Sequence, residues 1–382
     1  MPKATRSRIL HIMSSHGGGI STFIHNLAMG INKYGIVFDV ATFHECPPSF
    51  VEAIQRTGGD VYLIKNPKEE GWGKFKSSLN HIMKLYDYDI VHCHITGYRA
   101  LAYKLIVERY SRAKFIIHAH YTIDDDRMNS LRRLKHYLFQ RLNANLSEMY
   151  VGCSKIAVQS IFGYQIPDNQ IIVIPNSIDE QKFMYSPGRR ETLNQKWRET
   201  LGINSQTLVV GQIGRLTPIK NHRLTLQLAK HAKELQKDVQ FVIFGAGELE
   251  TDIRQSIAQN QLEDYVILAG RYQPIDEVYP LFDCVIMPSF HEGLGTVAIE
   301  SQAAGVPIVY SNTLPYEANL NVGLVTTMKL TDSVSLWFEA IIRAARTTRV
   351  PDETRLMALN KYKYTNYQAV RYYATVVAGV RL

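Results

Sequence analysis

The chain has 382 residues, of which 46% are hydrophobic, and this is the composition of a globular protein too long for one ordinary core. Its four cysteines lie far apart with no CxxC pair, and no stretch suits a signal peptide or a membrane span, which argues against a disulfide framework, a zinc site and an integral membrane protein. The formal net charge of +8 leaves three anionic partners open: nucleic acid, an acidic membrane surface or a phosphorylated ligand.

The first half alternates short apolar runs with helical patterns. A segment with its apolar residues on one helical face, 21–33, separates the first two runs. Strand, helix and strand repeated in this way predict a parallel, doubly wound sheet. The runs expected to form buried strands are 9–13, 37–43, 61–64, 89–93, 115–119, 149–153 and 171–175.

The densest group of basic residues falls within 127–141. Apolar residues recur there at helical spacing opposite the charges, at Leu131, Leu134, Leu138 and Leu142. We interpret this segment as an ordinary surface helix, with contact to a membrane surface as the alternative.

After Pro175 the chain turns polar and charged, which is typical of a domain boundary. The apolar runs then restart at 207–214, 240–247, 265–270, 284–288 and 307–311. We expect an N-terminal domain over 1–185, a linker over 186–200 and a second domain over 201–360. A C-terminal helix over 361–382 could pack on either domain, and we prefer the N-terminal one. Two doubly wound α/β domains would face each other across a cleft, with ligands at the carboxyl ends of the strands.

Two loops at such strand ends suit anions. Gly17, Gly18 and Gly19 lie between the first strand and the first helix, where bare amides and a helix N-terminus converge, although a tight turn explains them equally well. In the second domain Arg215 follows a strand, and Lys220 stands where the next helix begins. A lysine there opposes the helix dipole unless an anion is also present, so the two cations could clamp a diphosphate. Two solvated loop cations are the alternative.

Two glutamates, Glu292 and Glu300, frame a glycine loop later in this domain. No Lys or Arg occurs from Tyr272 to Met328, so neither glutamate has a cation nearby in the sequence. A carboxylate beside a phosphate would be repelled, so we expect Glu292 to accept hydrogen bonds from sugar hydroxyls and Glu300 from two vicinal hydroxyls of a ribose. A salt bridge to a distant base is the alternative for either.

Between these glutamates, the amides of Gly293, Leu294 and Gly295 and the first turn of a helix expected to begin at Thr296 can donate to phosphate. The segment GAGELE, 245–250, also follows a strand, but it has Glu where a dinucleotide fingerprint needs its third glycine. Its glycines indicate a turn that lets a ligand or the other domain approach.

The first domain contains two histidine pairs, each spaced two residues apart: His92 with His94, and His118 with His120. Each pair falls on one face of a strand. No nearby cysteine or carboxylate completes a ligand set, so we predict no metal site. A histidine that hydrogen-bonds a substrate and a structural core histidine are the remaining interpretations.

These segments resemble the retaining glycosyltransferases of family 4, which have the GT-B fold, and especially those of bacterial exopolysaccharide and capsule synthesis. The resemblance rests on GGGIxTF at 17–23, HAH at 118–120, IPNSID, GRLTPIKNH, FGAGELE, and above all EGLGTVAIESQAAGVPIV, in which seven residues separate two glutamates.

The resemblance implies a nucleotide-sugar donor, UDP-linked in most relatives, held mainly by the second domain. Glu300 would bind the ribose, Arg215 and Lys220 the diphosphate, and Glu292 with the amides of residues 293–295 the donor sugar. Thr296 stands at a position that would tune the donor.

On the other side of the reaction, His120 with the Gly18 and Gly19 loop would line the acceptor side and the reacting centre. Catalysis would then involve His120, Glu292, Arg215 and Lys220. The family is usually metal-independent and without cofactors, and the DDD at 124–126 falls in an expected loop beside basic residues. The acceptor would be a glycan or a lipid-diphosphate-linked glycan, and the enzyme would be cytoplasmic, with the inner face of the plasma membrane as a place of contact.

Two other functions compete with this one. A nucleotide-sugar epimerase or hydrolase on the same fold would change the sugar without any acceptor. A non-enzymatic polyanion-binding protein would show steeply salt-dependent binding, but the chain lacks a recognisable nucleic-acid motif, so we expect no nucleic-acid partner.

Overall fold

The computed structural model describes residues 7–123 and 128–381. The chain divides into two compact units, unit 1 comprising Met1–Ile178 with Lys363–Leu382, and unit 2 comprising Asp179–Tyr362. The acidic run at 124–126 and Arg127, both named above, lie outside the described residues.

Unit 1 is built on a parallel sheet of seven strands in the order β3-β2-β1-β4-β5-β6-β7. Each of the seven apolar runs expected in the first half overlaps one of these strands, which confirms a doubly wound α/β architecture. The strands are β1 Ser7–Ile12, β2 Ile36–Thr42, β3 Val61–Leu63, β4 Ile90–Cys93, β5 Lys114–Ala119, β6 Tyr150–Gly152 and β7 Ile171–Val173.

Helices connect these strands, and the first of them shows why. The apolar residues of α1 recur on one face, so Phe23, Ile24, Leu27 and Ile31 are all buried against the sheet. The helices of this unit are α1 Gly19–Ile31, α2 Pro48–Gln55, α3 Pro67–Glu70, α4 Trp72–Leu85, α5 Tyr98–Tyr110, α6 Ser130–Leu146, α7 Lys155–Phe162 and α15 Asn366–Val376.

Unit 2 repeats the design with a parallel sheet of six strands in the order β10-β9-β8-β11-β12-β13. Its sixth strand, β13, was not predicted, because the run VTTM is short and only half-buried at the sheet edge. The strands are β8 Leu208–Ile213, β9 Val239–Phe244, β10 Val266–Gly270, β11 Cys284–Met287, β12 Ile308–Ser311 and β13 Val325–Met328. The helices are α8 Glu180–Phe183, α9 Pro187–Leu201, α10 His222–Glu234, α11 Glu250–Gln259, α12 Thr296–Ala303, α13 Val334–Ala344 and α14 Asp352–Lys361.

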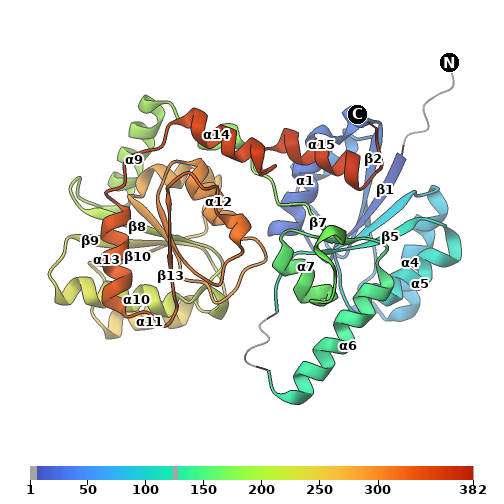
Figure 1. The fold of residues 1–382 in the computed structure, drawn as a ribbon, viewed down its shortest axis with the longest axis horizontal. Coiled ribbons are helices and arrows are strands. Elements are labelled where there is room, and N and C mark those ends of the chain that lie inside the picture. The colour runs from blue at the N-terminus through green and yellow to red at the C-terminus, as the bar shows by residue number, and fades with distance from the viewer. Residues whose placement is uncertain (1–6, 124–127, 382) are drawn as a thin grey trace. The chain divides into compact units, whose positions relative to one another are not determined.

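The expected linker, 186–200, is instead the helix α9, and it belongs to unit 2. Only Leu193 and Trp197 are buried along this charged helix, which is why its sequence reads as a connector. The indole of Trp197 donates a 2.8 Å hydrogen bond to the backbone oxygen of Glu277. The segment after residue 362 lies in unit 1, where α15 packs beside α1; Figure 1 shows this red helix next to the blue one.

Each sheet changes its winding direction at one point. In unit 1 the neighbours β1 and β4 flank it, and in unit 2 the neighbours β8 and β11 do so. Loops leave such neighbours in opposite directions at their carboxyl ends, which opens a crevice where ligands of α/β proteins commonly bind. The predicted site residues are located relative to these two points.

Candidate active site

In unit 2, the loop that follows β8 is held from beneath by a buried polar network. The side-chain oxygen of Gln212 accepts hydrogen bonds from His222 Nδ1 at 3.0 Å and Thr225 Oγ1 at 2.7 Å. Its Nε2 donates to the backbone oxygen of Lys220 at 2.9 Å. Burial lowers the pKa of His222, so this imidazole stays neutral near pH 7. The network fixes the loop from Arg215 to Lys220 at the carboxyl end of β8.

The loop that follows β11 lies directly against it. The amide of Phe290 donates to the backbone oxygen of Ile219 at 2.8 Å, and Lys220 Nζ lies 2.6 Å from Glu292 Oε1. The two side chains of this ion pair are 18% and 14% exposed, so water screens their charges only partly. Arg215 is exposed, and no ion pair of its guanidinium is found among the described residues.

The ion pair gives Glu292 the distant base that was the alternative for it, while its contact with sugar hydroxyls stays a prediction. The alternative of a distant base holds for Glu292, because β8 and β11 are neighbours and bring together residues that are 72 positions apart. A lysine at this position is therefore balanced by a carboxylate rather than left facing the helix dipole alone.

The glycine loop between the glutamates ends in a helix N-terminus. Gly295 has φ 84°, a left-handed conformation that favours glycine, and it precedes the first residue of α12, Thr296. No side chain caps this end of α12. The buried side chain of Leu294 anchors the loop in the core, and the amide of Ala298 donates to the backbone oxygen of Gly295 at 2.8 Å. The amides of Thr296 and Val297 at this helix end can donate to an anion.

Glu300 lies one turn further along α12 and does not pair with a base. Its Oε2 accepts a 2.7 Å hydrogen bond from the hydroxyl of Tyr279, which comes from the 3-10 helix η4 (Ile275–Leu281). Burial raises the pKa of Glu300 to about 7, while the Tyr279 hydroxyl and Lys220 act in the opposite direction. Tyr279 was missed by sequence reasoning, because nothing in an apolar segment of this kind distinguishes it from a core tyrosine.

Two arginines hold the other end of α12. Arg355, which is buried, donates to the backbone oxygen of Ala303, and Arg190 donates to that of Ala304. Guanidinium groups at a helix C-terminus satisfy free carbonyls and complement the dipole. Neither arginine was predicted, since each lies more than 50 positions from the helix it contacts, in α14 and α9 respectively.

The glycines of the 245–250 segment have a different role from the one expected. A Cβ on Gly245 would lie 1.9 Å from the backbone oxygen of Gly214, and one on Gly247 would lie 2.5 Å from that of Leu216. These glycines therefore let the loop after β9 pack against the loop after β8, and they support the Arg215 loop rather than admit a ligand.

In unit 1, the glycine loop after β1 also leads into a helix N-terminus. Gly17 and Gly18 have φ values of 109° and 102°, and Gly18 precedes the first residue of α1. A Cβ on either would meet nothing within 4 Å, so the backbone conformation alone requires glycine there. At Gly19, in contrast, a Cβ would lie 2.9 Å from Asn176 Nδ2, so space is limiting.

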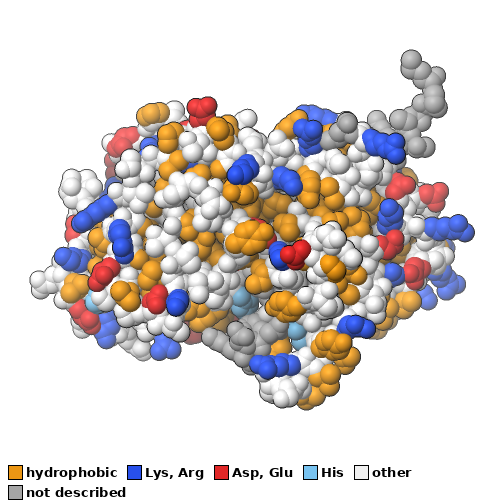
Figure 2. All heavy atoms as spheres, in the orientation of Figure 1, with side chains coloured by type: hydrophobic (Ala, Val, Ile, Leu, Met, Phe, Trp, Pro, Cys, Tyr) orange, Lys and Arg blue, Asp and Glu red, His pale blue; other side chains and the backbone are white. Residues whose placement is uncertain are grey.

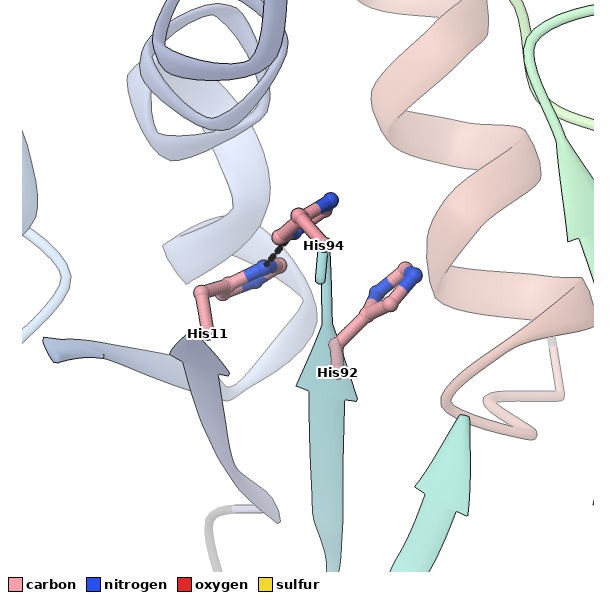
Figure 3. A group of neighbouring side chains, drawn as sticks. All are labelled: His11, His92 and His94. Atoms are coloured by element: carbon pink, nitrogen blue, oxygen red, sulfur yellow. Dashed lines mark hydrogen bonds between the residues drawn. The ribbon is translucent and has the colours of Figure 1, made fainter. Parts of the chain in front are cut away.

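His120 follows β5 and contacts a group of buried imidazoles. Its Nε2 lies 2.7 Å from His94 Nδ1, and its ring stacks on His118 with centroids 4.0 Å apart. His11 and His92 complete the group at the point where β1 and β4 meet (Figure 3). Burial lowers the pKa of both His11 and His120 to about 3, so these imidazoles are neutral near pH 7.

The histidines bring three ring nitrogens within 4.8 Å of one another in two sets, which the sequence did not suggest. The sets are His11, His92 and His94, and His94, His118 and His120. In the first set the ring planes lie within 30° of one another. A nitrogen lone pair lies in its ring plane, so near-parallel rings do not direct three lone pairs at one point, and a metal would need these rings to rotate.

Comparisons with known proteins agree with this architecture. Residues 17–182 match the family model Glycosyltransferase Family 4, and residues 194–321 match Glycosyl transferases group 1. Solved structures of Anabaena HepE with UDP and glucose, and with UDP-glucose, give TM-scores of 0.75 and 0.76 at 16% identity. The first comparison covers 98% of this chain and 100% of HepE, and the second covers 97% and 99%.

Two relatives are informative by sequence. The "Putative glycosyltransferase EpsF" of Bacillus subtilis is 29% identical over 96% of this chain and 95% of its own length. The Escherichia coli UDP-Gal:alpha-D-GlcNAc-diphosphoundecaprenol alpha-1,3-galactosyltransferase is 26% identical over 66% of this chain and 64% of its own length.

The class of protein is thus an α/β glycosyltransferase with the two-sheet GT-B fold. More particularly, the chain belongs to the glycosyltransferases whose N-terminal part is of family 4 and whose C-terminal part is of group 1, as its motifs had indicated.

Proposed function

We propose that this enzyme transfers a sugar from a UDP-sugar to a lipid-diphosphate-linked glycan in the synthesis of a surface polysaccharide, with retention of the anomeric configuration. The observation that carries the proposal is the arrangement of charge at the β8–β11 crevice. Lys220 and the amides of α12 offer positive potential, while Glu300 lies further along the same helix as an acceptor. A nucleoside diphosphate has the same order of groups, with phosphates at one end and ribose hydroxyls beyond them.

The diphosphate would share Lys220 with Glu292. Lys220 Nζ carries three donors and can contact a phosphate oxygen while still facing Glu292, whose own oxygens then accept from hydroxyls of the donor sugar. Arg215, exposed on the preceding loop, would donate two parallel hydrogen bonds from its guanidinium group to the diphosphate. The ion pair thus orders both loops before the donor binds.

Catalysis would consist mainly of stabilising the leaving group. As the bond between the sugar C1 and the diphosphate oxygen breaks, negative charge grows on the phosphate, where Lys220, Arg215 and the α12 amides act. The acceptor hydroxyl would form its new bond to C1 on the same face and pass its proton to a phosphate oxygen. Retention then follows without a carboxylate nucleophile, and the protein cations act without a metal ion.

The proposed acceptor draws support from two relatives. The Escherichia coli enzyme acts, by its name, on a diphosphoundecaprenol-linked sugar, and WaaG, a neighbour with a TM-score of 0.64 at 15% identity, is described as acting in lipopolysaccharide biosynthesis. Among the described residues, no helix is both long and apolar enough to cross a membrane. We propose that the enzyme works at the inner face of the plasma membrane, where a surface contact would bring it to its lipid.

Helix α6 has the features of such a contact. Its buried face is polar, with His136, Gln140 and Asn143 turned inward, and Asn143 Oδ1 accepts from the Gly97 amide at 2.7 Å. The leucines of its first turns are turned outward instead. Leu131, Leu134 and Leu138 are 61%, 55% and 58% exposed.

The basic residues of α6 alternate with these leucines, and Figure 2 shows hydrophobic and basic side chains together over this helix at the bottom of the view. A helix that exposes leucines among arginines and lysines suits an anionic lipid surface. The surface helix that we expected is thus present, and its outward leucines favour the membrane alternative.

Replacing Leu134 and Leu138 together by glutamate should weaken binding to vesicles of phosphatidylglycerol at least tenfold, because both apolar insertion and charge attraction are lost, the latter about 1 kcal/mol per charge. Cosedimentation with anionic and with zwitterionic vesicles measures this. The exposed Leu336 of α13, also changed to glutamate, is the matched control and should bind as the parent protein does. Equal binding by all three proteins would contradict a role for α6.

The donor is tested by thermal unfolding in the presence of nucleoside diphosphates and nucleotide sugars, because a ligand of the native state raises the midpoint. We expect UDP to stabilise the protein by several degrees, UMP by less, and EDTA to leave both shifts unchanged. A larger rise of the unfolding midpoint with a nucleoside diphosphate of another base would show that the donor is not UDP-linked. Loss of the UDP shift in EDTA with recovery on adding Mg²⁺ would contradict metal-independent binding.

A further inference from the structure

The buried imidazoles of unit 1 are arranged as two hydrogen-bonded rows. In the first row, His11 Nδ1 lies 3.0 Å from His94 Nε2, and His94 Nδ1 lies 2.7 Å from His120 Nε2. Figure 3 shows the first of these contacts. In the second row, the Tyr373 hydroxyl lies 2.7 Å from His92 Nδ1, and His92 Nε2 lies 3.2 Å from His118 Nδ1.

The ring geometry supports hydrogen bonds along each row. The ring planes of His11 and His94 are inclined by 10° with centroids 5.4 Å apart, and those of His92 and His118 by 18° with centroids 5.2 Å apart. The ring planes of His94 and His120 are inclined by 41°, with centroids 4.9 Å apart. The nitrogen–nitrogen distances of 2.7, 3.0 and 3.2 Å bring a nitrogen of each ring within hydrogen-bonding distance of the next ring. The rows stack on each other through the His118 and His120 rings, and Phe23 lies edge-on against both of these.

Every imidazole in the rows is neutral near pH 7, because burial lowers the pKa of each one. A neutral imidazole carries one N–H and one lone pair. The position of a single proton in a row therefore determines the tautomer of every ring in it. Three nitrogens at the row ends have no partner among the described residues: His11 Nε2, His118 Nε2 and His120 Nδ1.

Tyr373 sets the direction of the second row. Burial raises the pKa of its phenol, so it keeps its proton, and His92 Nδ1 is the acceptor found for that proton within the described residues. If Tyr373 donates to His92 Nδ1, the proton of His92 is on Nε2 and is donated to His118 Nδ1. His118 then carries its own proton on Nε2.

Burial sets the direction of the first row. One direction leaves an N–H without a partner at His11 Nε2 and the other at His120 Nδ1, and both of these atoms are buried. His11 as a whole is fully buried, whereas His120 is a partly exposed residue just after β5, so a bound ligand can supply the missing acceptor more readily at His120. A buried donor without a partner costs free energy, so the direction whose last N–H a ligand can satisfy is preferred. The favoured direction runs from His11 through His94 to His120, and it puts the proton of each ring on Nδ1.

We infer that the two rows hold His120 as a neutral N–H donor, with His11 and His94 as positioning residues, and that His120 is not a proton acceptor in the reaction. Its Nε2 is occupied by His94, and its Nδ1 already carries a proton. The group it would bind is an oxygen of a carbohydrate, a hydroxyl or an ether oxygen, so this inference rests on the proposed transfer function. Proton removal from the acceptor hydroxyl is then left to the departing phosphate.

The tautomers can be read without any substrate, by two-bond ¹H–¹⁵N correlation on protein labelled at histidine. We expect Nδ1–H on His11, His94 and His120, and Nε2–H on His92 and His118. Nε2–H on His120 would reverse the row and overturn the inference, while leaving the proposed transfer function intact. Absence of all transfer activity would instead contradict the proposed function and leave the tautomers unchanged.

A pair of tyrosine variants tests how the second row is directed. Tyr373→Phe removes the hydroxyl without changing the ring, so His92 and His118 should show mixed tautomers while the first row keeps Nδ1–H. Tyr372→Phe, at the neighbouring position outside both rows, should leave all five histidines unchanged. Unchanged His92 and His118 signals in Tyr373→Phe would overturn the assigned direction.

Activity distinguishes a donor from a base through two amide substitutions. The amide of His120→Asn falls near the position of Nδ1 and can donate but cannot accept a proton, whereas His120→Gln places its amide near Nε2. We expect the asparagine variant to retain transfer within about tenfold of the parent rate and the glutamine variant to lose about 100-fold or more. Equal large losses in both variants would overturn the donor role.

Discussion

Replacing Lys220 by alanine should lower the rate of sugar transfer by about 100- to 1,000-fold, the loss seen when one preorganised donor to developing charge is removed. Lys220 is the cation that lies within the β8–β11 crevice, 2.6 Å from Glu292 and held through its backbone by Gln212. Without it, Glu292 is left partly buried beside the leaving phosphate and repels it. Steady-state kinetics with saturating acceptor measure the change.

The matched control is Lys237→Ala, an exposed lysine of the same unit, which should transfer at the parent rate. Adding Glu292→Gln to Lys220→Ala removes the charge that Lys220 balanced and should recover thermal stability but not activity, because the phosphate still lacks this cation. Transfer by Lys220→Ala at more than half the parent rate would remove Lys220 from the mechanism.

Replacing Glu300 by glutamine should lower transfer about 100-fold, mainly through weaker donor binding. The amide still accepts from Tyr279, but it cannot accept from two ribose hydroxyls as a carboxylate can. In the parent enzyme, donor affinity should also fall as the pH drops below about 7, because Glu300 in the empty site then becomes protonated. The glutamine variant should lack this pH dependence.

The stability of the same variant is its folding control. Burial raises the pKa of Glu300 above its unfolded value, so its stabilising contribution is fully present below about pH 4.5 and is lost as the pH rises through about 7. Glutamine has no such loss. The melting temperature of Glu300→Gln relative to the parent should therefore increase from pH 5 to pH 8. A pH-independent difference would show that Glu300 is not buried as a carboxylate.

Much of this fold could be predicted because buried parallel strands appear in the sequence as short continuous apolar runs. Continuous apolar runs such as 115–119 and 171–175 gave seven strands in unit 1 and five of six in unit 2. The loops at the carboxyl ends of β8 and β11 could also be singled out, since both carry glycines and charges directly after a strand. The family that these loops resemble agrees with the two family models that the chain matches.

What the sequence could not show depends on contacts between distant residues. The Lys220–Glu292 pair spans 72 positions and exists because two strands are neighbours in the sheet. Tyr279 and Arg355 act on α12 from segments that read as ordinary core and surface. His11, the fifth histidine of the group, comes from a different strand than either predicted pair. Helix α6 buries a polar face and turns the leucines of its first turns outward, whereas an amphipathic pattern usually indicates the opposite orientation.

The central claim is that Lys220 binds the β-phosphate and Glu300 the ribose, and titration calorimetry with three ligands tests it most directly. For Lys220→Ala, we expect UDP affinity to fall about 10- to 100-fold and UMP affinity to change little, because UMP lacks the β-phosphate. For Glu300→Gln, UDP should weaken by a similar factor, and 2′,3′-dideoxyuridine diphosphate should bind parent and variant alike. Equal weakening of all three ligands by each variant would contradict the assignment.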